Sequence, residues 1–210
     1  MTARLLYVMD PMCSWCWGFA PVAKALVEQA QQAGVATHLV VGGLRSGSTA
    51  LDASTRRYIL DHWQAVAEAT GQPFRFDDAM PDGFVYDTEP ACRALVAARA
   101  LAPACVWPLL ALIQQGFYQH GLDVTRAPQL VELAERAGLA RAAFCEAFAH
   151  ADTRAATEAD FGWAQGLGIA GFPTLLAERN GQLALLTNGF QPLERLQPLL
   201  ERWLRQTACA

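Results

Sequence analysis

Hydrophobic residues near the start of the chain follow the pattern of a strand, a helix and a second strand. Leu5 to Met9 is a short apolar run, typical of a strand buried on both faces. Cys16 to Gln32 has apolar residues along one helical face, and Gly34 stands where a helix-ending glycine belongs. Val35 to Val41 predicts the next strand. This order is a βαβ unit, whose crossover makes the two strands parallel.

The middle of the chain predicts helices, and its end returns to strands. The expected helices cover approximately residues 53–69, 89–101, 106–119, 127–137, 140–149 and 153–167. After Gly168, Thr174 to Glu178 and Leu183 to Thr187 flank Asn180-Gly181, which is a strong hairpin signal. Pro192 to Arg205 then predicts a closing amphipathic helix.

A single sheet interrupted by a long helical insertion explains this order best. Neither group of strands is large enough to form a stable sheet alone, so we expect the two groups to pair. The predicted α/β domain comprises residues 1–47 and 169–210, and an all-helical insertion domain occupies residues 48–168. Two adjacent domains are the alternative that the pattern leaves open.

Composition and charge exclude several classes of protein. The chain has 210 residues, of which 53% are hydrophobic and 17% charged, and this excludes a disordered chain. Its net charge of −4 is unlike the basic surplus of a nucleic-acid-binding surface. Apolar runs stay shorter than the roughly 18 residues of a membrane span. We therefore expect neither nucleic acid nor a membrane among its partners.

The start of the sequence bears on the compartment and thereby on the cysteines. Five apolar residues precede Asp10, fewer than a secretory signal requires, so we expect a cytoplasmic protein. Structural disulfides are rare in that reducing compartment. Cys92 and Cys105 fall in or near expected helices and are interpreted as core thiols. Four of the six cysteines have no close partner in sequence: Cys92, Cys105, Cys145 and Cys209.

The other two cysteines lie in the most informative motif, Asp10-Pro11-Met12-Cys13-Ser14-Trp15-Cys16-Trp17. A structural zinc site would need a second close pair of ligands, and the sequence has neither another Cys-x-x-Cys nor a His-x₃₋₅-His pair. A chance pair of inert core thiols is a further alternative. Because the pair follows a strand and opens a helix of a βαβ unit, the motif favours a redox dithiol. We expect neither a metal nor a cofactor.

The helix assigns different roles to the two thiols. Unpaired N–H groups and the positive end of the helix dipole would stabilise a thiolate at Cys13. Cys16 lies one turn later on the same face, so it can attack a mixed disulfide formed at Cys13. We expect Cys13 to be the nucleophile and Cys16 the resolving thiol. Ser14 and Trp15, between them, are expected to contact the substrate and to tune the reduction potential.

Asp10 has two opposite interpretations. A carboxylate beside Cys13 would work against a thiolate there. It could instead relay a proton to or from Cys16 during resolution. The structural alternative is a residue at the end of a strand that pairs with solvent or an arginine.

Two loops complete the candidate site. Pro173, in Gly171-Phe172-Pro173-Thr174, begins a strand where it cannot donate to the ladder. A cis bond before it would leave the Phe172 backbone free to pair with a bound peptide beside Cys13. The loop Gly42-Gly43-Leu44-Arg45 follows the neighbouring strand, so Arg45 could hold an anionic group such as a glutathione carboxylate. A solvated arginine in an ordinary turn is the alternative.

Together these motifs resemble the DsbA family of thiol–disulfide oxidoreductases, and especially its cytosolic, FrnE-like branch of predicted disulfide isomerases. In that family a helical domain interrupts a thioredoxin fold. Cys13-Ser14-Trp15-Cys16 falls on the active-site Cys-x-x-Cys, and Gly171-Phe172-Pro173-Thr174 falls on the cis-proline loop. The resemblance implies a cis bond before Pro173 and, as partners, protein or peptide thiols and disulfides, with glutathione as a further candidate. Periplasmic DsbA has a histidine where this chain has Trp15, which argues against strong oxidising power.

Two other functions fit the same layout. Kappa-class glutathione transferases and 2-hydroxychromene-2-carboxylate isomerases resemble it, but they carry serine at the position of Cys13. A non-catalytic binding module, for example an adaptor that presents clients to a protease, would use the helical insertion as a surface. The motifs favour an enzyme, a thiol–disulfide oxidoreductase similar to protein disulfide isomerases.

Overall fold

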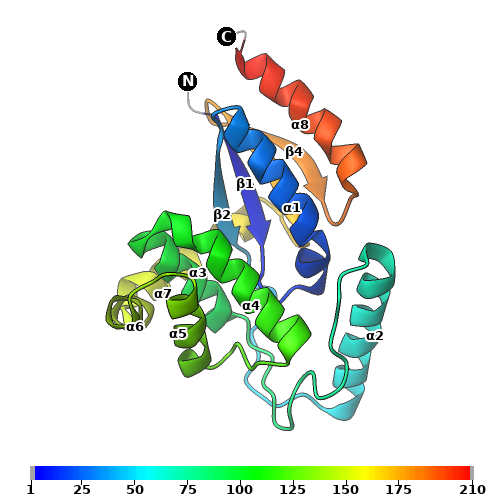
Figure 1. Cartoon of the computed structure of the whole chain (residues 1–210), viewed down its shortest axis with the longest axis vertical. Helices are drawn as coiled ribbons and strands as arrows, with labels where there is room; N and C mark the ends of the chain where they lie inside the picture. The colour runs from blue at the N-terminus through cyan, green and yellow to red at the C-terminus, as the bar shows by residue number, and fades with distance from the viewer. Residues whose placement is uncertain (1–2, 209–210) are drawn as a thin grey trace.

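A four-stranded sheet joins the two ends of the chain (Figure 1). The computed structural model describes residues 3–208, so Cys209 lies outside the described residues. The strand order is β2-β1-β3-β4. β1 (Ala3–Met9) runs parallel to β2 (Ala36–Val41) and antiparallel to β3 (Thr174–Arg179), which pairs with β4 (Gln182–Asn188). The prediction that the first and last strands share one sheet is confirmed.

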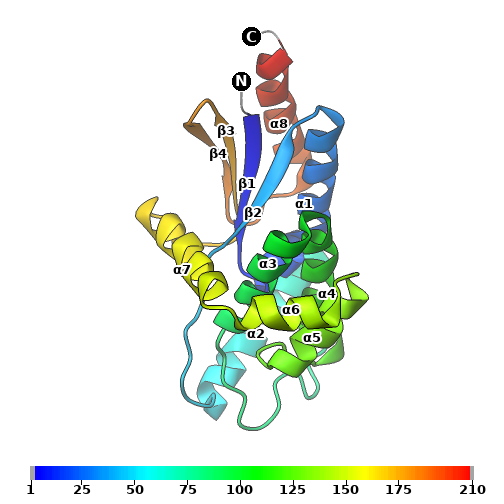
Figure 2. The ribbon, with the colours of Figure 1, turned by 90° about the vertical axis from the view of Figure 1, so that its left-hand side faces the viewer.

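Helices cover both faces of this sheet (Figure 2). α1 (Ser14–Gln32) and α8 (Leu193–Ala208) pack together on one face, and α7 (Ala151–Gly166) packs against β2 on the other. On the α1 side, the rings of Tyr7 and Phe19 lie 6.1 Å apart. On the opposite face, Val8 belongs to a small buried cluster with residues of β2 and α7. β1 is therefore buried on both sides, as its apolar run predicted.

The helical block lies between β2 and β3 in the chain and below the sheet in Figure 1. A buried aromatic cluster connects the first helix of the block, which carries Trp63, to the helix that carries Tyr118, and the two rings lie 4.9 Å apart. The thioredoxin fold interrupted by helices is thus present, whereas the domain boundaries at residues 47 and 168 stay a prediction. Besides α7, the elements of the block are α2 (Ala53–Thr70), α3 (Glu89–Leu101), the 3₁₀ turn η1 (Pro103–Cys105), α4 (Val106–His120), α5 (Ala127–Arg136) and α6 (Arg141–Ala149).

Helix α1 begins two residues earlier than predicted. Trp17 N–H donates to the carbonyl oxygen of Cys13 at 3.1 Å, which closes the first turn over the Cys-x-x-Cys motif. Cys13 is therefore the N-cap residue, with extended backbone angles. The difference places the first cysteine directly at the unpaired N–H groups of the helix.

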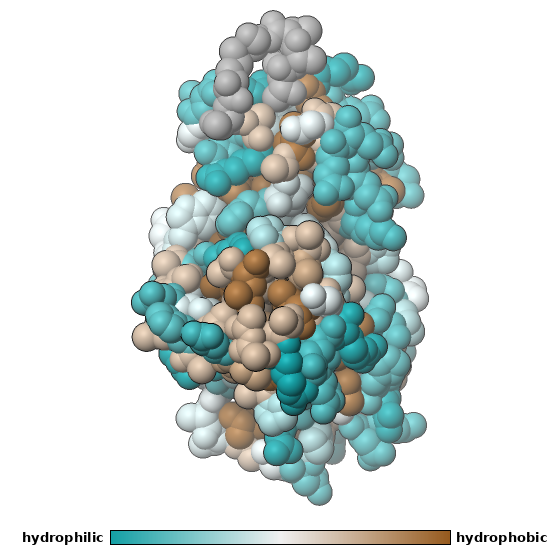
Figure 3. Space-filling model, turned by 60° about the vertical axis from the view of Figure 1, so that its left-hand side comes forward, coloured by the Kyte–Doolittle hydropathy of each residue, from teal (hydrophilic) through white to brown (hydrophobic). Residues whose placement is uncertain are grey.

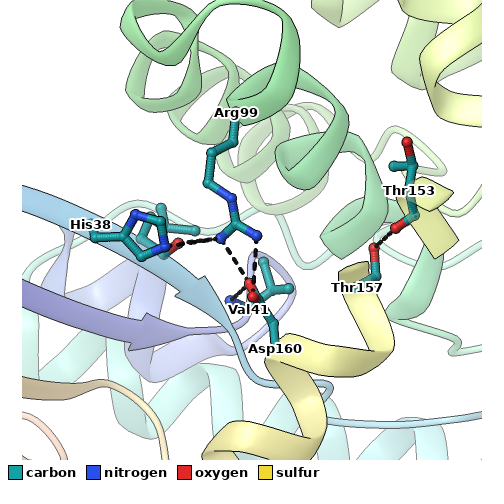
Figure 4. Close-up of polar contacts among 7 residues, drawn as sticks. His38, Val41, Arg99, Thr153, Thr157 and Asp160 are labelled. Atoms are coloured by element: carbon teal, nitrogen blue, oxygen red, sulfur yellow. Dashed lines mark hydrogen bonds and ion pairs between the residues drawn. The ribbon is translucent and has the colours of Figure 1, made fainter. Parts of the chain in front are cut away.

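An ion pair from the helical block covers the free edge of β2 (Figure 4). Arg99 of α3 donates to the carbonyl oxygen of Leu39 at 2.7 Å, and Asp160 of α7 accepts from the backbone N–H of Val41 at 3.1 Å. The two side chains also pair with each other at 2.8 Å. Because an edge strand otherwise leaves such backbone groups unpaired, this arrangement closes the sheet edge and fastens two helices to it.

Candidate active site

The two thiols of the motif differ in their access to solvent. Both are free thiols, and Cys13 is 6% exposed whereas Cys16 is 0% exposed. Cys13 lines a cavity of about 280 Å³, and its thiol donates to the carbonyl oxygen of Phe172 at 3.6 Å. Cys13 is thus the thiol of the pair that borders the cavity, and Cys16 lies one helical turn behind it.

Cys16 is held in its neutral form by its surroundings. Burial raises the pKa of its thiol well above the usual value, and the neighbouring Cys13 raises it further. Loss of its proton therefore needs an acceptor inside the protein, since the side chain is fully buried.

Asp10 directly follows β1 and is fully buried. Its Oδ1 accepts from Met12 N–H at 2.8 Å, and its Oδ2 accepts from Leu44 N–H at 2.7 Å and from the Cys92 thiol at 3.4 Å. Burial raises the pKa of the carboxyl group, and the donated hydrogen bonds oppose that shift. The alternative in which Asp10 pairs with solvent or an arginine is wrong, because backbone N–H groups, the Thr88 side chain and the Cys92 thiol surround the buried carboxyl group.

The loop after β2 reaches the same cavity. Thr88 N–H donates to the carbonyl oxygen of Arg45 at 2.9 Å, which fixes the loop against the start of α3. The Arg45 guanidinium lies over the ring of Tyr86, 5.0 Å from its centroid, and lines the cavity beside Cys13. The Tyr86 ring therefore positions the arginine at the wall of the cavity that Cys13 also lines.

The loop before β3 lies across the cavity from the start of α1. The Phe172–Pro173 peptide bond is cis, in agreement with the resemblance. The Phe172 ring packs over Gly42 so closely that a Cβ added there would lie 2.1 Å from the ring. The Phe172 carbonyl oxygen accepts from the Cys13 thiol, so this backbone group has a partner when the dithiol is reduced.

Several residues that line the cavity have no recognisable signal in the sequence. Tyr86 donates from its hydroxyl to the carbonyl oxygen of Met12 at 2.5 Å, within the active-site turn. Tyr58 and His62 are exposed on α2, and the His62 ring lies 6.1 Å from Trp15. Helical periodicity does not show which side of α2 borders the cavity, because that depends on how the helix packs in three dimensions. The cavity is lined by Met12, Cys13, Ser14, Trp15, Leu44, Arg45, Tyr58, Ile59, His62, Trp63, Tyr86 and Phe172.

Within residues 3–208, His, Cys, Asp and Glu side chains form no group of three or more suited to a metal ion. Among the helices of that range, none combines the length and the apolar character needed to cross a membrane.

Solved structures similar to this chain include a candidate disulfide isomerase and a disulfide reductase. A candidate protein disulfide isomerase from Nitrosomonas europaea is 39% identical, with a TM-score of 0.90, over 98% of this chain and 99% of that chain. Cytosolic disulfide reductase DsbM from Pseudomonas aeruginosa is 31% identical, with a TM-score of 0.80, over 97% of this chain and 99% of its own. A second DsbM structure, described as containing GSH, is 30% identical.

A curated relative covers a smaller part of the chain. The ClpXP adapter protein SpxH of Halalkalibacterium halodurans is 26% identical over 135 residues, which are 62% of this chain and 44% of that protein. The match therefore spans less than half of the relative's length.

The model of the DSBA-like thioredoxin domain matches residues 4–201, which include both halves of the sheet and the helical block. The site geometry and this match lead to the same assignment. The chain belongs to the DSBA-like thioredoxin domain family of thiol–disulfide oxidoreductases.

Proposed function

We propose that the protein exchanges disulfides through Cys13 as the nucleophile and Cys16 as the resolving thiol. The observation that carries this proposal is the asymmetry of the pair. Cys13 lies at the helix N-terminus on the wall of a cavity, and Cys16 is fully buried behind it. The first thiol can meet an external disulfide, and the second can meet only a disulfide formed at the first.

The reaction balances as two successive exchanges. The Cys13 thiolate attacks one sulfur of a substrate disulfide, and the other half of the substrate leaves as a thiolate. Cys16 then loses its proton and attacks Cys13 Sγ, which forms the Cys13–Cys16 disulfide and releases the second thiolate. The substrate gains two electrons and the dithiol loses two. Reduction and isomerisation both pass through the same mixed disulfide at Cys13.

Asp10 is the internal acceptor of the Cys16 proton in this scheme. Its carboxyl group is buried, and after burial and the Cys13 thiol its charge is a further contribution to the raised pKa of Cys16, which indicates that the two groups interact. A carboxylate whose pKa is raised by burial is a stronger base than an exposed aspartate. The same group can return the proton when the reaction runs in reverse.

Arg45 and the aromatic residues of the cavity form the substrate-binding part of the proposal. Arg45 provides a fixed cation for a substrate carboxylate. Ser14, Trp15 and Phe172 line the same cavity, and the Pro173 loop places the Phe172 carbonyl opposite Cys13. Protein or peptide disulfides are the substrates that we expect this cavity to bind. The structure of DsbM with GSH supports glutathione as one of these substrates. Because DsbM is a cytosolic disulfide reductase, the similarity also supports a cytoplasmic location.

A binding module is the second candidate, because one relative that matches part of this chain is an adapter protein. Figure 3 shows apolar side chains gathered on the surface of the helical block, where such a module would bind its client. Binding through that surface would not need the dithiol. Replacement of Cys13 by serine therefore separates the two functions: exchange is lost, and client binding survives.

Trapping of the mixed disulfide tests the proposed function. The Cys16→Ser variant, treated with glutathione disulfide, should accumulate one glutathione on Cys13, detected by mass spectrometry of the intact protein and its peptides. The Cys13→Ser variant should accumulate much less on the buried Cys16. Equal labelling of the two variants would contradict the assignment of nucleophile and resolving thiol. Labelling of Cys16 alone would reverse it.

A further inference from the structure

Cys92 is a buried thiol for which the exchange reaction above has no use. It lies on α3, is 0% exposed, and its Sγ is 3.4 Å from Asp10 Oδ2. The contact joins the helical block to the residue that follows β1, across 82 positions of sequence. A side chain from the inserted helices therefore contacts the proposed proton acceptor directly.

The Thr88 side chain also hydrogen-bonds the Asp10 carboxyl group, and two further donors to Asp10 Oδ2 differ in character. Leu44 donates a backbone N–H at 2.7 Å, whose direction the loop fixes. Cys92 donates a thiol hydrogen at 3.4 Å, and a thiol can rotate about its C–S bond. A thiol is also a weak acceptor, so it can receive a hydrogen bond from a protonated carboxyl group. Cys92 is therefore a partner that suits Asp10 in both protonation states.

We propose that Cys92 is a positioning residue for proton transfer between Cys16 and Asp10. Its thiol donates to the ionised Asp10 carboxylate before resolution, and it accepts from the protonated carboxyl group afterwards. The inference rests on the proposed function, in which Asp10 takes the Cys16 proton. It adds that a residue of the helical block sets the pH above which the Asp10 carboxylate can accept the Cys16 proton.

The titratable groups around Asp10 do not ionise in the same pH range as Asp10 itself. Burial raises the pKa values of four titratable neighbours, so in the reduced protein these groups stay neutral under acidic conditions. They are Cys16 from α1, Tyr86 from the segment before α3, Cys92 from α3 and Tyr118 from α4.

Charged groups near Asp10 and Cys92 make contacts of their own. Glu89 of α3 faces Cys92 and pairs with Arg93 at 2.8 Å. The Arg45 guanidinium lies on the cavity side, over the Tyr86 ring. A change in the acidic limb of the resolution rate on replacing Cys92 therefore reports the Cys92–Asp10 contact.

The test is the pH dependence of a single turnover with glutathione disulfide. The measured quantity is the rate at which the second glutathione leaves the mixed disulfide at Cys13. In Cys92→Ala, loss of the donor should move the acidic limb to higher pH, with a rate about threefold lower below the midpoint and unchanged above it. Cys92→Ser keeps a donor and acceptor and should restore the wild-type limb.

Cys105→Ala is the matched control, because Cys105 is a half-buried thiol of the same block near Gly138. Its profile should equal that of the wild type. An unchanged limb in Cys92→Ala, or a loss of equal size at every pH, would overturn the role of Cys92. The Asp10→Asn variant distinguishes failure of the Cys92 inference from failure of the proposed function. If the mixed disulfide of this variant is resolved at the wild-type rate at every pH, Asp10 is not the proton acceptor.

Discussion

The thiol of Cys13 donates a hydrogen bond to the carbonyl oxygen of Phe172 at 3.6 Å, across 159 positions of sequence. The contact brings the start of α1 against the loop before β3, although the whole helical block separates them in the chain. The Phe172 ring in turn packs over Gly42, in the loop after β2. Three loops from the same end of the sheet therefore depend on one another for their positions.

Replacement of Gly42 by alanine should disturb this junction. An added Cβ would lie 2.1 Å from the Phe172 ring, so the ring and its loop must move. We expect the free energy of unfolding to fall by about 1–3 kcal/mol, as for overpacked cores. Formation of the mixed disulfide at Cys13 should slow as well. Urea denaturation and the rate of reaction with glutathione disulfide measure the two effects.

Gly162→Ala provides the control, because a Cβ there would meet nothing within 4 Å and the residue lies on helix α7. This variant should keep the wild-type reaction rate. Equal behaviour of the two variants would show that the Phe172 loop is not held by the glycine.

Replacement of Arg45 by glutamine should weaken the binding of anionic disulfides selectively. The guanidinium lines the cavity beside Cys13, and removing it takes away a charged partner for a carboxylate. We expect about a tenfold higher KM for glutathione disulfide, given a charge-assisted hydrogen bond of about 1.5 kcal/mol. The KM for the uncharged bis(2-hydroxyethyl) disulfide should change little. Steady-state kinetics with the two substrates measure the difference.

Arg57→Gln is the matched control, since Arg57 lies on α2 and lines a different pocket. Its kinetics should equal those of the wild type. An equal rise of KM for both disulfides in Arg45→Gln would assign the arginine to the structure of the loop rather than to a substrate carboxylate.

The buried carboxyl group of Asp10 should make stability depend on pH in a defined direction. Burial raises its pKa in the folded protein. Its protonated form is thus favoured by folding, and this contribution is complete below the pKa of an unfolded aspartate, about 3.9. The contribution is lost as the pH rises through the raised value.

Asp10→Asn removes this titration. The free energy of unfolding of the wild type, relative to that of the variant, should therefore fall as the pH rises from acidic to neutral. Urea denaturation at a series of pH values measures the difference. A difference that stays constant or grows with pH would show that the folded protein favours the ionised carboxylate.

The Arg99–Asp160 pair should contribute to global stability. Arg99→Leu leaves Asp160 largely buried without its cation and removes the donor to the Leu39 carbonyl oxygen. We expect a loss of about 2 kcal/mol in the free energy of unfolding. The control is Lys24→Ala, which breaks an exposed pair with Glu28 at 3.9 Å and should cost less than about 0.5 kcal/mol. Similar losses in the two variants would contradict the anchoring role of the ion pair.

Local sequence patterns predicted most of the fold because each element carries its own signal. The buried run of β1, the periodicity of α1 and the Asn180-Gly181 turn act over a few residues. The start of α1 was placed too late because apolar periodicity begins at Cys16, whereas hydrogen bonding begins at Cys13. The helical insertion followed from the two incomplete groups of strands.

Contacts between distant segments account for what the sequence did not show of the site. Arg45 and Phe172 could be placed near Cys13 because their loops follow or precede strands at the same end of the sheet. Cys92 was interpreted as a core thiol, since its contact with Asp10 depends on how α3 packs. The same holds for Tyr86, which bonds the active-site turn from the segment before α3.

The redox equilibrium of the Cys13–Cys16 pair tests the central claim most directly. The protein is equilibrated with a series of ratios of reduced to oxidised glutathione, and the intramolecular disulfide is quantified after thiol alkylation. We expect a reversible two-electron transition in the wild type and none in Cys13→Ser. Two thiols that stay reduced at every ratio would contradict disulfide exchange through this pair and would favour a binding function.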